Sequence, residues 1–497
     1  MDTPRFTRFG LMRLRSTAGV PRAAAAAALL LGLFLYAGCA GTPARPATGA
    51  PPSSGSGDGN AGFSEIAYVA ADGSIRTVNR DGSGDSVVTA RTSSAPDRDV
   101  RFGIPAWSPD GHHLAFVRFE SGTDGRRADI RVVSADRPTP RTIVEHVAVS
   151  PQYLAWFPGS EHLGYVGARP GSSELELHTA AVGGNAASGG RNEARGTPGE
   201  PRLVGRPLYW DVCPGGTPIV AHVDGTRPYG GRVSVLSAAT GAGRGRSDAA
   251  GARDRVVEDD PSPFRAPDCA PDGTSAVVAT RDGELVSVSL ASGERRTLAA
   301  FEGRTVFSYD PSGRRLAYIA GTATRFGGVR GALSLVEQPG RDGQRVTAVD
   351  GAPSVTAFFW SPDGTRLAYF QPAFDGENPS EFLVSCTVVD FVTGESATIG
   401  PLRLSPIFAQ EVLVRFDQFA RGGSIWSPDG SALALGLIDA GGTPAVYVLP
   451  VEGADATLRR VAPGDLPIWR PGAAERPDRL AAWRLFQRWA YLYVRVS

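Results

Sequence analysis

The stretch Trp107-Ser-Pro-Asp-Gly111, followed by Leu114-Ala-Phe-Val117, decides the fold of this 497-residue chain. Ser, Pro, Asp and Gly in succession favour a type I turn, because Pro presets φ and Asp accepts local backbone hydrogen bonds. The apolar, alternating residues that follow are typical of a β-strand. The stretch therefore predicts two antiparallel strands joined by a tight turn, which we call a corner.

The corner is one of eight related copies. Successive copies begin between 40 residues (Cys269 to Tyr309) and 66 residues (Trp360 to Trp426) apart, in and above the spacing of about 40 to 50 that four-stranded propeller blades show. The first residues of the eight copies are Trp107, Trp156, Val212, Cys269, Tyr309, Trp360, Trp426 and Trp469. We expect a structural role in the repeat for the corner residues Trp107, Pro109, Gly111, Trp156, Pro158, Trp360, Pro362, Gly364, Trp426, Pro428, Gly430, Trp469 and Pro471.

The repeat predicts an all-β fold, a β-propeller of four-stranded blades. The 62 Gly and 39 Pro residues are too many for long helices. Strand patterns between Ile66 and Val88 lack a corner of their own, and Leu466-Pro-Ile-Trp469 resembles a first strand without followers. Pairing these N- and C-terminal strands would close the ring and gives eight blades. Seven is the alternative, if the weaker corner at Val212 or Trp156 does not found a blade.

Three segments, 107–117, 360–370 and 426–437, resemble the β-propeller repeat of the TolB family, which also occurs in tricorn protease and in prolyl oligopeptidases. The resemblance covers residues 63–472. It implies the fold, but no particular activity, because a repeat motif reports how each blade packs. TolB itself docks on a partner lipoprotein at the cell envelope. The resemblance does not extend to that specific partner.

The N-terminal segment predicts export and lipid attachment. Five Arg residues precede the apolar run Ala23–Tyr36, which is shorter than the roughly 20 residues that a spanning helix needs. The following Ala37-Gly38-Cys39 resembles a bacterial lipobox, and this implies that Cys39 carries the lipid and becomes the mature N-terminus. We therefore expect a signal peptide (1–38), a flexible Gly/Ala/Pro/Ser tether (39–62) and a single propeller domain (63–497). An ordinary cleaved signal peptide or an uncleaved anchor are the alternatives.

Two segments have more than one interpretation. Residues 401–423 hold several Phe, Val and Leu residues, and they would form either a lid or docking element on one face or an extended outer strand. The tail, residues 477–497, would form strands or an amphipathic, membrane-surface helix.

The sequence predicts no catalytic, cofactor-binding or metal-binding residue. No Gly-x-Ser-x-Gly motif occurs, and the six His residues lack the i, i+4 spacing of a helical zinc site. Basic and acidic residues balance at 51 each, which does not indicate nucleic-acid binding. Cys213 and Cys269 occupy nearly equivalent positions in consecutive corners, so a disulfide between them is possible outside the cytoplasm.

These features favour a monomeric envelope lipoprotein, anchored through Cys39 on the extracytoplasmic side of the cell membrane. Its propeller would bind a protein, a peptide or a glycan. The alternative is a propeller enzyme, a glycan lyase or hydrolase with its site at the axial mouth. Three His side chains meeting near the axis would favour that enzyme.

Overall fold

The computed structural model describes most of the segment from Phe63 to Gly472, which lies in the compact unit Asn60–Ser497. The segments predicted as signal peptide (1–38) and tether (39–62), which include Cys39, and the tail 477–497 lie outside the described residues, so what the sequence predicts for them stays a prediction. The described ranges are 63–91, 98–123, 125–145, 150–168, 171–172, 174–182, 201, 203–205, 208–214, 218–224, 231–236, 255–262, 266–325, 327–373, 383–451 and 457–472.

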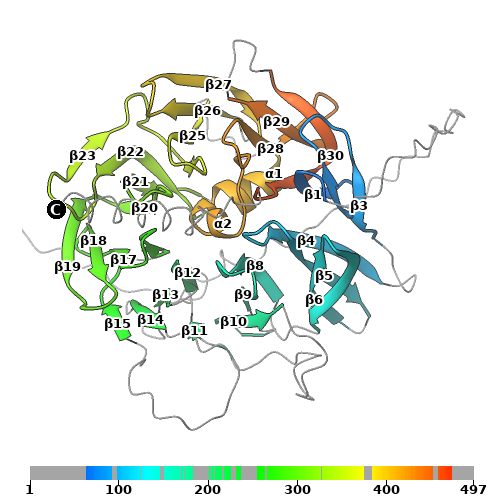
Figure 1. Cartoon of the computed structure of the whole chain (residues 1–497), viewed down its shortest axis with the longest axis horizontal. Coiled ribbons are helices and arrows are strands. Elements are labelled where there is room, and N and C mark those ends of the chain that lie inside the picture. Colours follow the sequence, from blue (N-terminus) through cyan, green and yellow to red (C-terminus); the bar gives the residue numbers. More distant parts are fainter. Residues whose placement is uncertain are drawn as a thin grey trace, which may run out of the picture. The chain divides into compact units, whose positions relative to one another are not determined.

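Seven antiparallel sheets follow one another around a ring in this part of the chain (Figure 1). We count each hydrogen-bonded sheet as one blade and name it by its strands. Six blades have four strands each, the first innermost. Their strands are β4 (Asp99–Trp107), β5 (His113–Gly122), β6 (Gly125–Ser134), β7 (Arg137–Val144); β8 (Ser150–Trp156), β9 (His162–Ala168), β10 (Leu175–Ala181), β11 (Leu203–Gly205); β12 (Leu208–Val212), β13 (Ile219–Asp224), β14 (Gly231–Leu236), β15 (Arg255–Glu258); β16 (Asp268–Cys269), β17 (Ser275–Ala279), β18 (Glu284–Ser289), β19 (Arg295–Ala300); β20 (Arg304–Tyr309), β21 (Arg315–Ala323), β22 (Val329–Glu337), β23 (Arg345–Ala348); β24 (Ala357–Trp360), β25 (Arg366–Pro372), β26 (Leu383–Asp390) and β27 (Ser396–Arg403).

The seventh blade has six strands in the order β28-β29-β30-β1-β2-β3. Its central strand β30 pairs with β29 through its first half (Ala445 opposite Pro463) and with β1 through its second half (Ile66 opposite Trp469). The two ends of the described chain therefore share one sheet. The bounds are β28 (Ala432–Ile438), β29 (Pro444–Pro450), β30 (Arg459–Trp469), β1 (Ile66–Ala70), β2 (Ile75–Val78) and β3 (Ser86–Thr89).

The favoured count of eight blades is wrong, because the described residues form seven. The weaker corners are not the reason, since Trp156 ends the inner strand β8 and Val212 ends the inner strand β12. The count falls because β30 runs unbroken from one group of strands into the next. In addition, Trp426 makes only an isolated bridge to Leu433 and begins no separate inner strand.

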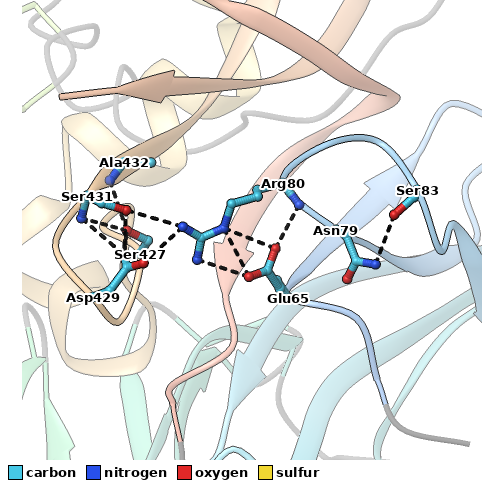
Figure 2. Close-up of polar contacts among 8 residues, drawn as sticks. All are labelled: Glu65, Asn79, Arg80, Ser83, Ser427, Asp429, Ser431 and Ala432. Atoms are coloured by element: carbon cyan, nitrogen blue, oxygen red, sulfur yellow. Dashed lines mark hydrogen bonds and ion pairs between the residues drawn. The ribbon is translucent and has the colours of Figure 1, made fainter. Parts of the chain in front are cut away.

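An arginine ties the N-terminal strands to the far end of the chain (Figure 2). Arg80 Nε donates to Glu65 Oε1 at 3.0 Å, and Arg80 Nη1 donates to Asp429 Oδ2 at 3.0 Å. The guanidinium also lies 5.1 Å from the centre of the Trp469 ring. The ring is thus closed by side chains as well as by the backbone of β30.

The three corners with the sequence Ser-Pro-Asp-Gly share one turn structure. In the first, Gly111 N donates to Ser108 O at 2.8 Å, and Gly111 has a φ of +67°, which suits glycine. The Ser108 hydroxyl donates to Asp110 Oδ1 at 2.5 Å, and Asp110 Oδ1 accepts from His112 N at 2.9 Å. The serine-to-aspartate bond recurs at Ser361 and Asp363 and at Ser427 and Asp429.

The corner tryptophans pack between neighbouring blades. Trp156 Nε1 donates to Ala106 O at 3.0 Å, and Trp426 Nε1 donates to Phe359 O at 3.0 Å. Trp360 makes the same bond to Ser308 O at 3.2 Å. In each case the acceptor directly precedes the first corner residue of the blade before. Each of these rings thus buries apolar surface and adds a hydrogen bond across an interface between blades.

Candidate functional site

Three short helical segments lie across the centre of the ring (Figure 1). They are α1 (Pro406–Phe408), η1 (Ala409–Leu413) and α2 (Phe416–Gly422), and we call them together the axial plug. The plug belongs to the connection between β27 and β28. The corners join the first and second strands of each blade at one face of the ring. Because the strands of a blade alternate in direction, the connection that leaves the fourth strand begins at the other face, and the plug enters the ring from there. The segment α2 contacts the inner strands β8, β12, β20 and β24, so one insertion touches four blades.

A buried serine and a buried aspartate hold the start of the plug. Ser405 Oγ accepts a hydrogen bond from Phe408 N at 3.0 Å, which is a helix N-cap, and its hydroxyl donates to Asp465 Oδ2 on β30. Pro406 follows at the first helical position, where a missing N–H costs no hydrogen bond. Burial raises the pKa of Asp465, while the bond from Ser405 opposes that rise. The cap thus links the plug to the strand that closes the ring.

Aromatic contacts fix the rest of the plug. The Phe416 ring lies 4.8 Å from that of Phe358 and 5.8 Å from that of Phe359 on β24. At the other side, the Tyr153 hydroxyl donates to the carbonyl of Gln418, and Gln418 Nε2 donates to Trp210 O at 3.5 Å. The plug is therefore built into the core.

Neither interpretation of residues 401–423 describes the whole segment. Residues 401–403 do end an outer strand, β27. From Ser405 onward the chain turns inward and becomes helical, which an extended outer strand does not allow. The element is also not a lid on one face, because Phe408, Val412 and Phe416 are fully or almost fully buried.

Three corners begin with a residue other than tryptophan, and each marks a distinct feature. They are the corners at Val212, Cys269 and Tyr309. Cys269 is joined by a disulfide to Cys213 of the preceding blade, with 5.2 Å between the two Cα atoms. The other two corners adjoin cavities. The space that a tryptophan fills elsewhere is thus occupied by a covalent bond at one interface and is open at two.

The cavity at Val212, which we call the Val212 cavity, has a volume of about 270 Å³. Tyr153, Ala155 and Trp156 of β8 line one side, and Trp210 and Val212 of β12 line the other. Because Tyr153 and Trp210 also bond to Gln418, the cavity lies against the axial plug. Its walls are mainly aromatic and aliphatic. Such walls suit an apolar group about the size of one large side chain.

The second cavity, which we call the Tyr309 cavity, has a volume of about 320 Å³ and lies between blades β16–β19 and β20–β23. Hydroxyl groups dominate its walls, among them those of Ser275, Ser287 and Tyr309. The two cavities therefore differ in chemistry, although both arise where a corner lacks tryptophan.

Among the described histidines, His112 and His113 are neighbours with ring centres 4.9 Å apart, whereas His162, His178 and His222 lie on other blades. His113 Nδ1 lies 2.7 Å from Ser134 Oγ, and His178 Nε2 lies 2.9 Å from Glu176 Oε2. His146 lies outside the described residues. Within the described ranges, no group of three or more His, Cys, Asp or Glu side chains could hold a metal ion. The meeting of three His side chains that would favour a metal-dependent enzyme is not seen there.

Sequence reasoning missed both the plug and the cavities, although signals for them were present. Ser405-Pro406 is a helix start, and Phe408, Val412, Phe416 and Phe419 follow at helical spacing. For the cavities, the signal was the loss of tryptophan at three corners. The repeat pattern marks only the corners at Val212 and Trp156 as weaker, and it attaches no cavity to the missing tryptophan at Cys269 or Tyr309.

Comparisons with known proteins concern the fold. No protein-family model and no curated protein matches the chain. Solved structures that are similar include a eukaryotic initiation factor, with 11% identity, a TM-score of 0.47, and 82% of this chain and 99% of that chain covered. An oligogalacturonate lyase in complex with manganese has 13% identity and a TM-score of 0.45, with 79% and 99% covered. The β-propeller domain of the trilobed protease from Pyrococcus furiosus has 9% identity and a TM-score of 0.42, with 73% and 96% covered.

Among the helices of the described part, none combines the length and the apolar character needed to cross a bilayer.

Proposed function

We propose that this protein is an exported, lipid-anchored binding module. In this proposal, the propeller recognises a protein or peptide partner of the cell envelope by taking one apolar side chain of the partner into the Val212 cavity. Cys39 carries the lipid, and the tether holds the ring away from the membrane surface. The partner is bound and is not chemically altered.

The observation that carries the proposal is the aromatic lining of the Val212 cavity. Tyr153, Trp156 and Trp210 line the cavity with rigid rings, of which those of Trp156 and Trp210 are buried in the core, and aromatic residues dominate the energetics of protein interfaces. A volume of about 270 Å³ is near the lower end of ligand pockets, which matches a single side chain. Rigid walls favour affinity, because little conformational entropy is lost on binding. The axial plug supplies this rigidity through its bonds to Tyr153 and to Trp210.

The Cys213–Cys269 disulfide supports the exported location. Disulfides persist in oxidising compartments outside the cytoplasm and are rare in the reducing cytosol. The sequence before the propeller, with its apolar run and Cys39, is consistent with the same location.

The cavity is tested by filling it. Val212→Trp places at this corner the residue that five other corners carry, so it fills the cavity with a side chain that the repeat accommodates. The measurement is crosslinking in intact cells followed by purification and mass spectrometry. We expect a reproducible envelope partner with the wild type, and recovery reduced by at least about tenfold, or about 1.4 kcal/mol, with Val212→Trp.

Tyr309→Trp is the matched control, because it fills the other cavity and is expected to leave partner recovery unchanged. Unchanged recovery with Val212→Trp, or turnover of a substrate by the purified protein, would contradict the proposal. The anchor is tested separately by mass analysis of the mature N-terminus. Wild-type protein should carry a lipid, and the Cys39→Ala variant should not.

A further inference from the structure

The Tyr309 cavity lies where two side chains are smaller than their equivalents at the interface between blades β4–β7 and β8–β11. Between blades β4–β7 and β8–β11, the Trp156 ring stacks on His113 at 5.8 Å, and His113 bonds to Ser134. Tyr309 takes the place of Trp156 in the repeat, and Ser275 takes the place of His113. The stacked pair that fills one interface is thus replaced by a phenol and a serine, which leave about 320 Å³ open.

The wall opposite Tyr309 is a cluster of hydroxyl groups. Ser275 on β17 is paired with Ser289 on β18, and Ser287 lies two residues before Ser289, so all three share one face of the sheet. Farther from the corner, this face becomes apolar and packs in the core through Val277, Ala279 and Leu285. Each serine hydroxyl can both donate and accept a hydrogen bond. The polar end of the face is therefore suited to a ligand that also carries hydroxyl groups.

The Tyr309 phenol is buried and adds a hydroxyl to this wall. Burial is the main cause that raises its pKa, the charges of Asp268 and Asp272 raise it further, and hydrogen bonding with Ser287 and Ser275 opposes the rise. The hydroxyl therefore stays protonated at neutral pH, where it can donate a hydrogen bond.

Charged side chains at the rim carry both signs. Asp272 and Glu294 contribute carboxylates, and Arg296 and Arg341 contribute guanidinium groups. Arg296 is held in place because its Nη1 donates to Gly340 O at 2.7 Å and its Nη2 donates to Arg341 O at 3.1 Å. With two carboxylates and two guanidinium groups, the rim favours neither an anionic nor a cationic ligand. Ala270, Pro271 and Pro339 add apolar surface that C–H groups of a ligand can contact.

We propose that the Tyr309 cavity binds one neutral sugar ring of a saccharide. A sugar ring combines several hydroxyl groups with apolar C–H faces. Its hydroxyl groups match the serine cluster and the Tyr309 hydroxyl, and its C–H faces match the apolar surface of Pro271 and Pro339. The volume is near the lower end for ligand sites and therefore fits a single ring. This site is separate from the Val212 cavity, so it does not depend on the proposed protein partner.

The test is titration of the full-length protein with three neutral probes, namely methyl glucoside, methyl galactoside and N-acetylglucosamine. Binding is followed by saturation-transfer NMR and by calorimetry. We expect at least one probe to bind the wild type. Tyr309→Trp should weaken that binding by at least about tenfold. Ser287→Ala, which removes one hydroxyl and keeps the cavity, should weaken it by about fivefold.

Two variants serve as controls that should bind like the wild type. Val212→Trp fills the other cavity, and Ser134→Ala removes the hydroxyl that corresponds to that of Ser289, at the interface that Trp156 covers. The proposal is overturned if none of the three probes binds the wild type, or if Tyr309→Trp binds the probe as tightly as the wild type. Should Tyr309→Trp not fold, unchanged binding by Ser287→Ala overturns it instead. Loss of sugar binding with retained partner recovery distinguishes this site from the proposed function.

Discussion

Arg80 and Asp429 are 349 residues apart in the sequence, yet Arg80 Nη1 donates to Asp429 Oδ2 at 3.0 Å. The same guanidinium pairs with Glu65, so one side chain connects the start of the described chain to a corner near its end. Within the seventh blade, this contact links the two groups of strands that share β30, namely β1 to β3 and β28 to β29, and it therefore stabilises the closure of the ring.

Replacing Arg80 should therefore weaken the closure. We expect Arg80→Ala to lower the free energy of unfolding by about 1 kcal/mol, because the side chain is partly exposed and water screens its ion pairs. Hydrogen exchange should accelerate in β1 to β3 before it does in the other blades. Arg403→Ala, on the exposed outer strand β27, is the control and should change neither quantity. Uniform acceleration across all blades would contradict a local role in closure.

The corner tryptophans allow the hydrogen bond to be separated from the ring. Trp426→Phe removes the bond from Nε1 to Phe359 O, whereas Trp107 Nε1 has no hydrogen-bond partner within the described residues. Both substitutions remove a similar amount of aromatic surface. We expect urea unfolding to show a loss that is about 1 kcal/mol larger for Trp426→Phe than for Trp107→Phe. Equal losses would show that the bond between blades adds no net stability.

Asp465 should give stability a dependence on pH that is opposite in sign to that of Asp439, which lies in the turn between β28 and β29. Burial raises the pKa of its folded carboxyl above the ordinary value of 3.8, so the folded protein keeps a proton that the unfolded chain has lost. Its contribution to stability therefore falls as the pH rises through that interval. We expect Asp465→Asn to gain in Tm relative to the wild type as the pH rises above the ordinary pKa of 3.8.

Asp439→Asn is the comparison for this prediction. Hydrogen bonds from Thr443 and Gly441 lower the pKa of Asp439, so its stabilising contribution is present above 3.8 and is lost as the pH falls through the lower folded value. The difference in Tm between the Asp439 variant and the wild type should thus become more unfavourable as the pH rises. The same slope for both variants would contradict the assignment for Asp465.

The disulfide should contribute strongly because it closes a long loop. Cys213 and Cys269 are 56 residues apart, for which the loop-entropy relation gives a stabilisation of about 4 kcal/mol. Reduction with a thiol, or the Cys213→Ser/Cys269→Ser double variant, should lower Tm accordingly. Cys386→Ala is the control, since burial raises the pKa of that thiol to about 12 and it forms no disulfide. In this variant the response to reduction should remain unchanged.

Local turn chemistry made the repeat predictable, whereas features that depend on distant partners were not. The residues Ser108 to Gly111 specify their own turn, and unpaired strand patterns at both ends of the repeat indicated closure. The blade count failed because nothing local shows that β30 stays unbroken between its two partners. Likewise, Phe408 and Phe416 lie at helical spacing in the sequence. Only their packing against the inner strands determines that α1 and α2 lie at the centre of the ring.

The cavities show the same limit. Val212 and Tyr309 are visible as departures from the tryptophan of other corners, but an open space depends on what the preceding blade places opposite. At Cys269 the preceding blade supplies Cys213, and a covalent bond results. At Tyr309 it supplies Ser275, and a cavity results.

The sharing of β30 between two groups of strands has a consequence for biosynthesis. Strands β1 to β3 are translated first, and the partner that covers the edge of β1 is the last of the described strands to be translated. Until then, β1 offers unpaired backbone groups on which foreign strands can assemble. A prematurely terminated chain keeps this unpaired strand edge. Pairing of β30 with β1 therefore distinguishes completed molecules from fragments that proteases should remove.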